Sequence, residues 1–311
     1  MKYLVTGGAG FIGSNLVGKL LTLGHNVIVI DNFCAGKKEN LEEHSTNPHL
    51  VIYERDICKD LDDIFTKHEF DAIFHFAALP RVQYSIAEPI KTNHANITGT
   101  LKLLELCKKY NVKRFVFSSS SSVYGEQDIM PLTEDMTPLP ISPYALQKLV
   151  GEHYCRLYHL LYGVETIALR YFNVYGPKQD PNGSYACLMP KFIKMIKEGH
   201  KPNINGDGEQ TRDFCYVDDV VNANILSATT TNQECFGNFF NIGTGKNTSV
   251  NKITKEIIKL SKNNIEPIHG DTVKEPKNTL ADNNKARKLL GWEPKTFIEE
   301  GLLKTYNFFS K

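Results

Sequence analysis

The stretch VTGGAGFIG, residues 5–13, decides the fold of this chain. It joins a short apolar strand to an apolar helix pattern that continues to Leu23, and it spaces its glycines as G-x-x-G-x-x-G. Glycines in such a turn let the backbone approach a ligand closely, and the helix N-terminus can then face a pyrophosphate. The alternative is a glycine turn that only packs helix on strand. We predict a dinucleotide site here, lined by Gly7, Gly10, Phe11, Ile12 and Gly13.

The next strand favours NAD over NADP as the dinucleotide. The apolar run NVIVI, residues 26–30, is followed by Asp31 and Asn32, and Asp31 stands 18 residues after Gly13. A carboxylate at this place binds the ribose hydroxyls of an adenosine and repels the 2′-phosphate of NADP. No arginine follows Asp31 immediately. We therefore predict bound NAD, contacted by Asp31 and Asn32.

Short apolar runs rich in β-branched residues alternate with helical patterns through the first half of the chain. The runs expected to be strands cover residues 3–6, 26–30, 50–56, 71–78, 114–120 and 166–173. This alternation is typical of a doubly wound parallel sheet that is buried on both faces. We predict an α/β fold with a Rossmann NAD-binding domain at residues 1–170. A smaller substrate-binding lobe is expected over residues 171–311, with segments near 214–240 returning to the first domain.

Composition excludes several classes of protein. The 311 residues include 36 Lys and Arg against 35 Asp and Glu, so there is no electrostatic footprint for nucleic acid or an anionic membrane. No apolar run reaches the roughly 18 residues of a membrane span, and the start does not look like a signal peptide, so we expect a cytoplasmic protein. The seven Cys and ten His show no CxxC or HExxH spacing, so we expect no metal site.

The stretch SPYALQK, residues 142–148, predicts a catalytic pair. Ser142 suits a helix N-cap and the proline after it suits the first helical position, so Tyr144 and Lys148 lie on nearly the same face of one helix. The positive helix end and the ammonium favour the phenolate, and we expect them to lower the pKa of Tyr144 toward neutral. Serines at residues 118–122 end the strand upstream and offer a hydroxyl nearby. A surface Tyr–Lys pair is the alternative.

Taken together, these motifs resemble those of the extended short-chain dehydrogenases/reductases, and among them the NAD-dependent UDP-sugar 4-epimerases. The resemblance runs through GGAGFIG, HFAA, NITGT, SSSSSVYG, YALQK, RYFNVYGP, NGDGEQTRDFCYVDD, FNIGTG and LLGW. The segments QDPNGSYACLMPKF and TRDFCYVDD are most similar to members that act on N-acetylated hexosamine nucleotides. The resemblance implies reversible inversion at C4 of UDP-glucose/UDP-galactose and UDP-N-acetylglucosamine/UDP-N-acetylgalactosamine, through a transient 4-keto sugar and tightly bound NAD.

The resemblance also implies roles for individual residues, matched position by position. The catalytic residues would be Ser120, Tyr144 and Lys148, with Tyr144 as the base. Cofactor contacts would come from Tyr144 and Lys148 and further from Asp56, Ile57, Phe76, Ala77, Ala78, Asn96, Ser118 and Tyr171. Substrate contacts would come from Ser120, Tyr144, Asn173, Leu188, Asn205, Arg212 and Thr279. A homodimer would form through helices at about 88–109 and 143–162, whose apolar stripes include Ile97, Leu101, Leu104, Leu149, Leu157 and Leu160.

Two details near the end of the chain bear on the substrate. In the resembling enzymes, the position of Thr279 in NTLAD lies beside the sugar C2 substituent, and a bulky Tyr there accompanies specificity for sugars without an acetyl group. The small Thr279 therefore predicts room for an acetamido group. The arginine of R-x-G-D or R-x-G-E that binds the second phosphate in relatives is missing from HGDTVKEPKNTLAD. Lys274 and Lys277 are the candidates to replace it.

Two other functions stay open from the sequence. A sugar-nucleotide 4,6-dehydratase begins with the same oxidation, but relatives that eliminate water carry an Asp-Glu pair where this chain has Ser121 and Ser122. Decarboxylating relatives carry a Glu at the place of Ser122. A non-catalytic NAD-sensing module is expected to have lost Ser120, Tyr144 or Lys148, and all three are present.

Overall fold

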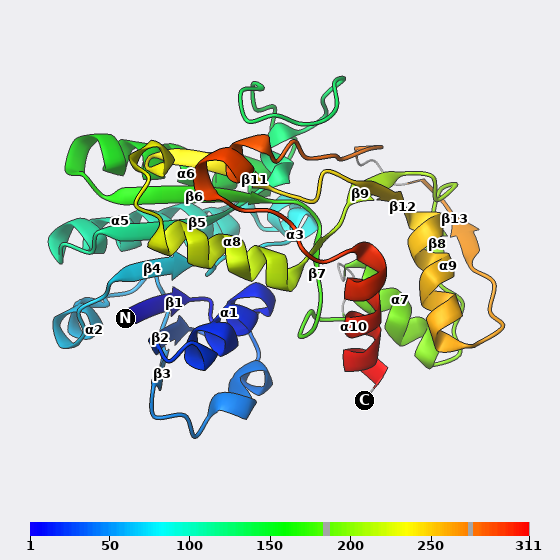
Figure 1. Cartoon of the computed structure of the whole chain (residues 1–311), viewed down its shortest axis with the longest axis horizontal. Coiled ribbons are helices and arrows are strands. Elements are labelled where there is room, and N and C mark those ends of the chain that lie inside the picture. Colours follow the sequence, from blue (N-terminus) through cyan, green and yellow to red (C-terminus); the bar gives the residue numbers. More distant parts are fainter. Residues whose placement is uncertain (183–186, 273–275, 311) are drawn as a thin grey trace.

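The structure, a computed structural model, describes residues 1–182, 187–272 and 276–310. At its centre is a seven-stranded parallel sheet with the strand order β11-β6-β5-β4-β1-β2-β3 (Figure 1). The predicted doubly wound α/β fold is confirmed. The strands are β1 (Lys2–Thr6), β2 (Asn26–Asp31), β3 (Leu50–Glu54), β4 (Ala72–His75), β5 (Arg114–Ser120), β6 (Glu165–Tyr171) and β11 (Asn238–Ile242).

Burial on both faces explains the continuous apolar sequences of the central strands. β1 pairs with β2 and β4, so that Leu4 lies opposite Ile28 and Ile73, and all three side chains are buried. The carboxyl ends of parallel strands meet at the same edge of a sheet. This edge therefore collects the last residues of five strands, which are Thr6, Asp31, His75, Ser120 and Tyr171.

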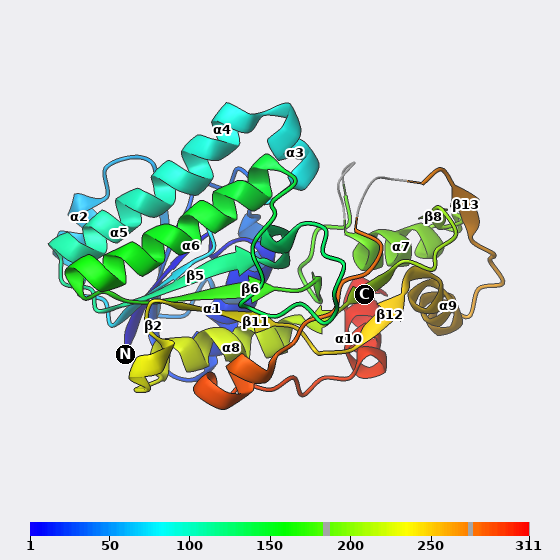
Figure 2. The same cartoon turned by 90° about the horizontal axis from the view of Figure 1, so that it is seen from above.

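Helices cover both faces of the sheet. Figure 2 shows α5 and α6 on one face and α1 and α8 on the other. The helix expected at about 88–109 is continuous but contains a π-helical turn, η2, between α4 and α5. The helices around the sheet are α1 (Phe11–Thr22), α2 (Asp62–Lys67), α3 (Val82–Ala87), α4 (Pro89–Asn93), η2 (His94–Thr98), α5 (Gly99–Lys109), α6 (Pro143–Tyr162) and α8 (Val217–Thr229), with the short turns η1 (Lys38–His44), η3 (Ser121–Tyr124), η4 (Gln233–Cys235) and η5 (Ala286–Leu290).

A smaller lobe lies beyond the carboxyl edge of the sheet (Figures 1 and 2). It contains α7 (Leu188–Lys197), α9 (Val250–Ser261), α10 (Ile298–Ser310), β8 (Asn203–Asn205), β9 (Thr211–Asp213), β12 (Asn247–Ser249) and β13 (Ile268–Gly270). β8 pairs with β13 and β9 with β12, while β7 (Val174–Tyr175) pairs with β10 (Cys215–Tyr216). α8 and β11 run back along the sheet. The assignment of cofactor binding to residues 1–170 and substrate binding to 171–311 stays a prediction.

No helix within the described ranges is both long and apolar enough to span a bilayer.

Candidate active site

The glycine turn between β1 and α1 leaves no room for side chains. Gly7 has a φ of +69°, and a Cβ there would lie 2.6 Å from the backbone nitrogen of Ala77. A Cβ at Gly13 would lie 2.3 Å from the carbonyl oxygen of Gly7. Gly10 is the N-cap of α1, which continues with Phe11 and Ile12. The backbone is thus open to close approach, and the N–H groups that begin α1 can bind a pyrophosphate.

Asp31 ends β2 beside this turn. Its carboxylate accepts hydrogen bonds from the backbone nitrogens of Ala9 at 2.9 Å and Phe33 at 2.8 Å. Burial raises the pKa of Asp31, and these two hydrogen bonds act in the opposite direction. A carboxylate has about four lone-pair positions, so capacity remains for ribose hydroxyls. Asn32 shapes the following turn by accepting a hydrogen bond from Cys34 N at 3.1 Å.

The next predicted cofactor residues follow the same edge of the sheet. Asp56 and Ile57 come shortly after β3, and Asp56 fixes the turn there by accepting a hydrogen bond from Cys58 N at 2.8 Å. A second group comes directly after β4 and faces the glycine turn, as the approach of Gly7 to Ala77 shows. That group is Phe76, Ala77 and Ala78. The predicted cofactor residues thus form a continuous row across β1 to β4.

The polar side-chain groups of Asn96 and Tyr171 are hydrogen-bonded within the protein. Asn96 accepts a hydrogen bond from Leu79 N at 2.8 Å and donates one to Gln147 Oε1 at 2.7 Å. Tyr171, at the end of β6, donates to Asn224 Oδ1 at 3.0 Å. The side chain of Asn96 therefore holds the backbone that follows β4, and the cofactor contacts of Asn96 and Tyr171 stay predictions.

Ser120, Tyr144 and Lys148 meet where α6 crosses the end of β5. Ser142 caps α6 as predicted, because its hydroxyl accepts from the backbone nitrogen three residues later at 3.2 Å. The Tyr144 hydroxyl is hydrogen-bonded to Ser120. Lys148 Nζ donates to the carbonyl oxygen of Ser118 at 2.6 Å and lies 5.8 Å from the centre of the Tyr144 ring. The arrangement places a phenol, a hydroxyl partner and a cation at one point of the sheet edge.

Three predicted substrate residues come together from distant parts of the sequence. Asn173 Nδ2 donates to Thr279 Oγ1 at 3.2 Å. Thr279 N donates to the carbonyl oxygen of Thr211 at 3.1 Å, and the next residue, Arg212, donates from Nη1 to the carbonyl oxygen of Lys277 at 3.1 Å. We call these contacts the Asn173–Arg212–Thr279 cluster. It joins the end of β6 to β9 and to the segment before Ala281.

The other substrate candidates of the smaller lobe are Leu188, Asn205 and the two lysines near Thr279. Leu188 is the first residue of α7 and is partly buried, whereas Asn205 ends β8 and is exposed. Lys274 lies outside the described residues. Lys277 is exposed, and its carbonyl oxygen is the atom that contacts Arg212.

Comparison with known proteins decides the family. The model of the NAD dependent epimerase/dehydratase family matches residues 3–243. The chain belongs to this family. It is 42% identical to the UDP-glucose 4-epimerase of Thermotoga maritima, solved with UDP-glucose, with a TM-score of 0.94 over 100% of this chain and 99% of that one. It is 41% identical to the UDP-N-acetylglucosamine 4-epimerase of Methanobrevibacter ruminantium M1, solved with UDP-N-acetylmuramic acid, with a TM-score of 0.94 over 99% and 98%.

A further relative carries the name of a different activity. The UDP-glucuronate 4-epimerase of Thermodesulfobacterium geofontis is 39% identical over 98% of this chain and 95% of its own length. The resemblance to NAD-dependent epimerases is confirmed, and the chain is an NAD-dependent enzyme. The glycine turn and the carboxylate of Asp31 fit that cofactor.

The prediction that the pKa of Tyr144 is lowered toward neutral is wrong for the chain without its cofactor. Burial raises the pKa of Tyr144 to about 12, although the hydrogen bond with Ser120 acts in the opposite direction. Burial also lowers the pKa of Lys148 to about 8. Desolvation of the phenolate therefore outweighs the helix end and the ammonium. A positive charge bound beside the phenol would lower its pKa again.

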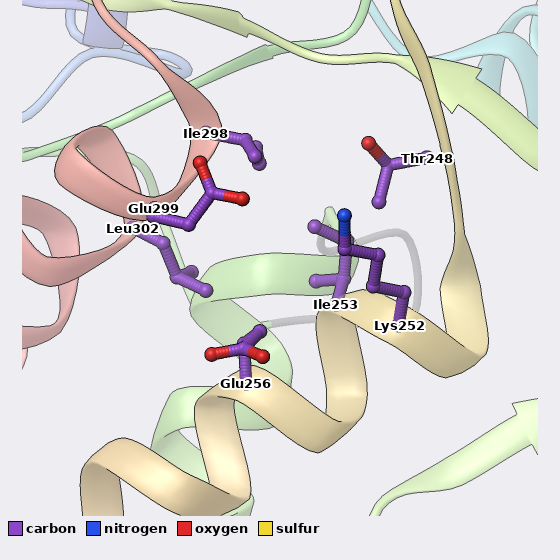
Figure 3. A pocket seen from close by; sticks show the side chains of 7 residues that line it. All are labelled: Thr248, Lys252, Ile253, Glu256, Ile298, Glu299 and Leu302. Atoms are coloured by element: carbon purple, nitrogen blue, oxygen red, sulfur yellow. The ribbon is translucent and has the colours of Figure 1, made fainter.

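A recess elsewhere in the lobe has a different character. It lies between α9 and the start of α10 and is apolar at its base, where Ile253, Ile298 and Leu302 meet (Figure 3). Lys252, Glu256 and Glu299 surround these side chains. None of the predicted site residues lines it, so we assign it to packing within the lobe.

Proposed function

We propose that this NAD-dependent UDP-sugar 4-epimerase interconverts both UDP-glucose with UDP-galactose and UDP-N-acetylglucosamine with UDP-N-acetylgalactosamine. The observation that carries the proposal is the small Thr279 at the Asn173–Arg212–Thr279 cluster, where an acetamido group needs volume. Nearly equal identity to a UDP-glucose 4-epimerase (42%) and a UDP-N-acetylglucosamine 4-epimerase (41%) supports the dual specificity.

Each catalytic residue has a distinct task in this reaction. Tyr144, as the phenolate, takes the proton of the sugar 4-hydroxyl, and Ser120 holds the same oxygen by a hydrogen bond. Lys148 binds the nicotinamide ribose, and its charge favours the phenolate. When bound, NAD supplies the hydride acceptor and donor for C4. Arg212 binds the diphosphate of UDP, so the sugar can turn over while the nucleotide stays fixed.

The end of β5 argues against elimination or decarboxylation as the main reaction. Elimination of water needs an acid and a base in addition to Tyr144. Residues 118–124 contain four more serines and a tyrosine besides Ser120 and no carboxylate, and Ser122 Oγ is buried. Inversion at C4 needs no such additional groups.

Proton NMR of the purified enzyme with each of the four UDP-sugars tests the proposal. We expect each substrate to give its C4 epimer, because the signals of the sugar protons report the C4 configuration directly. A dehydrated 4-keto product would favour a dehydratase. The loss of C4 inversion for both acetylated sugars would reject the dual specificity.

Thr279→Tyr should narrow the specificity. We expect kcat/KM for the two acetylated substrates to fall ~10-fold or more, roughly 1.4 kcal/mol, because the ring fills the volume beside C2. UDP-glucose and UDP-galactose should be largely spared. Thr279→Ser is the matched control, since it keeps the hydroxyl that accepts from Asn173. Equal losses for both substrate pairs would show that residue 279 does not border the C2 substituent.

Asp31→Ser should weaken the preference for NAD over NADP. Removal of the carboxylate removes its repulsion of a 2′-phosphate, so the ratio of the two dissociation constants should move toward NADP by ~10-fold or more. Calorimetric titration of nucleotide-free protein with each cofactor measures this ratio. An unchanged ratio would contradict the ribose-binding role of Asp31.

We also propose a homodimer through the continuous helix of α4 and α5 and through α6, which lies beside it (Figure 2). Leu104, one of the predicted stripe residues, is fully buried and belongs to the core. On α6, however, Leu157 is 46% exposed, and Leu160 and Leu161 are each 65% exposed, while Ile90 on α4 is 86% exposed. An apolar face of this kind is typical of an interface with a second copy.

Light scattering at micromolar concentration should give twice the 35.1 kDa mass of the chain. Leu160→Glu should give the monomer, because it places a charge in the apolar face. Leu23→Glu is a control at an exposed leucine at the end of α1 and should leave the dimer intact. A wild-type protein that scatters as a monomer would reject the interface.

A further inference from the structure

Glu152 is a buried carboxylate to which the sequence gives no role. It lies on α6, four residues after Lys148, and is 4% exposed. Its Oε1 accepts from Ser119 Oγ at 2.5 Å and from Arg170 Nε at 2.9 Å. Its Oε2 accepts from Arg170 Nη2 at 2.7 Å. One carboxylate thus joins α6 to the ends of two strands, β5 and β6.

At the end of β5, the contact between Glu152 and Ser119 lies between two contacts of the catalytic residues. Ser118 accepts from Lys148, Ser119 donates to Glu152, and Ser120 is hydrogen-bonded to Tyr144. Three successive serines are therefore fixed to three residues of the same helix. The distance between the hydroxyl of Ser120 and the phenol of Tyr144 depends on how α6 lies against β5, and the contact of Ser119 is the middle one of the three.

Arg170 holds Glu152 from the other side. Its side chain is fully buried, and its guanidinium lies 4.7 Å from the centre of the Tyr124 ring and 4.0 Å from that of Phe239. A buried ion pair of this kind is weak evidence for stability, since desolvation of two charges offsets their attraction. A role in the site therefore accounts better for the pair than a contribution to stability.

We propose that Glu152, held by Arg170, is a positioning residue of the epimerase reaction: it fixes the strand end that carries Ser120 against Tyr144 and supports the ammonium form of Lys148 with its negative charge. This inference rests on the proposed catalytic roles of Tyr144 and Lys148. Glu152 acts through its negative charge and through its hydrogen bonds to Ser119 and Arg170.

The groups around Lys148 show why this charge matters. Besides burial, Cys155 and Glu152 on its own helix act on the pKa of Lys148, and it lies near Tyr144 on the same helix and His75 on β4. The pKa of Cys155 is raised well above its usual value and that of His75 is lowered to about 3, both by burial, so both are neutral near pH 7. Of these four neighbours, Glu152 is thus the one with a negative charge.

The sign of the expected effect follows from the charge. Burial lowers the pKa of Lys148 to about 8, and Glu152 acts to raise it. Without that charge the pKa of Lys148 falls further, so the ammonium is lost at a lower pH. As the pH is raised, activity that needs the ammonium should then be lost earlier than in the wild type. The alkaline limb of the kcat/KM profile therefore moves to lower pH.

Glu152→Gln in the NAD-bound enzyme tests the proposal. It keeps an oxygen for Ser119 but removes the charge. We expect the alkaline limb of kcat/KM for UDP-glucose to move down by about one pH unit, and kcat to fall ~10-fold through misplacement of Ser120. Superimposable pH profiles of the variant and the wild type would overturn the proposal.

The matched control is Glu165→Gln, which breaks a second buried Arg–Glu pair, this one between β5 and β6. Arg114 and Glu165 begin β5 and β6, are each 8% exposed, and lie 2.6 Å apart from Nη2 to Oε2. This pair is at the opposite end of the strands from the site. We expect the control to lower the thermal midpoint in the same way and to leave the pH profile unchanged, so an equal shift in both variants would also overturn the proposal.

Two further measurements keep the test independent of folding and of the assigned reaction. If Glu152→Gln alone does not fold, Glu152→Gln with Arg170→Met removes both charges together and should move the alkaline limb in the same direction by a smaller amount, because a positive charge is lost as well. The pKa of Lys148 can be read by NMR in protein labelled with [13C]lysine, with the signal assigned by its loss in Lys148→Met. A lower Lys148 pKa in the Glu152 variant supports the coupling even if the substrate is not the proposed one, and an unchanged pKa rejects it.

Discussion

Tyr144→Phe should lower kcat for every accepted UDP-sugar at least ~10²-fold, the usual size of general base catalysis. The substitution removes only the hydroxyl that is hydrogen-bonded to Ser120, and the ring can keep its packing. KM should change little, because the nucleotide contacts are assigned to other residues. Single-turnover absorbance of reduced NAD at 340 nm should show hydride transfer slowed to the same extent, since proton removal and hydride transfer belong to the same oxidation.

Tyr158→Phe is the matched control on the same helix. The Tyr158 hydroxyl donates to Glu105 and lies well along α6 from the site. This variant loses a hydrogen bond as Tyr144→Phe does, but its kcat should stay within about twofold of the wild type. Near-normal turnover by Tyr144→Phe would remove Tyr144 from the base role and leave Ser120 as the nearest replacement.

The raised pKa of Tyr144 sharpens this prediction. In the chain alone the phenol is protonated near pH 7, because burial raises its pKa to about 12. The base therefore depends on positive charge that the chain alone does not supply, and the oxidised cofactor is its source. Proton removal should thus require bound NAD in its oxidised form. The rate of substrate oxidation should fall as the pH is lowered, whereas the affinity for the UDP-sugar should not.

Local motifs explain why so much of the fold could be predicted from the sequence. The backbone conformation of the turn VTGGAGFIG and of the helix start at Ser142 depends on about ten neighbouring residues in each case. Glycine, proline and capping side chains determine it there. The central strands are continuous apolar runs because both of their faces are buried. The doubly wound pattern predicts that these strands are parallel, and their order is known from the structure.

The parts that sequence reasoning missed depend on contacts between distant residues or on a balance of energies. The hydrogen bond between Asn173 and Thr279 joins residues 106 positions apart, and no local sequence pattern predicts it. The pKa of Tyr144 was expected to fall, but burial outweighs the favourable partners. Arg170 did leave a signal, because a charged residue inside the apolar strand TIALRYFN requires a buried partner. The identity of that partner, Glu152, emerged only from the fold.

Gly7→Ala should abolish stable retention of NAD and so most of the activity of the purified enzyme. An alanine at a φ of +69° is strained by about 1–2 kcal/mol. Its Cβ would also lie 2.6 Å from Ala77 N, a backbone atom that can yield only if the end of β4 moves. Overpacking of this kind costs about 1–3 kcal/mol more. Relief of the contact shifts the turn that faces the pyrophosphate, so NAD affinity should fall ~10²-fold, on the order of 2.7 kcal/mol.

Gly24→Ala separates the two parts of this effect. Gly24 has a similar φ of +77°, but a Cβ there would meet nothing within 4 Å. This variant should lose about 1–2 kcal/mol of stability from backbone strain and keep its NAD. Acid release of bound nucleotide, followed by an enzymatic NAD assay, compares the two variants at equal protein concentration. If Gly7→Ala retains as much NAD as Gly24→Ala, then the close approach of Gly7 to Ala77 is a packing contact of the sheet, and the pyrophosphate must bind along α1 without help from this turn.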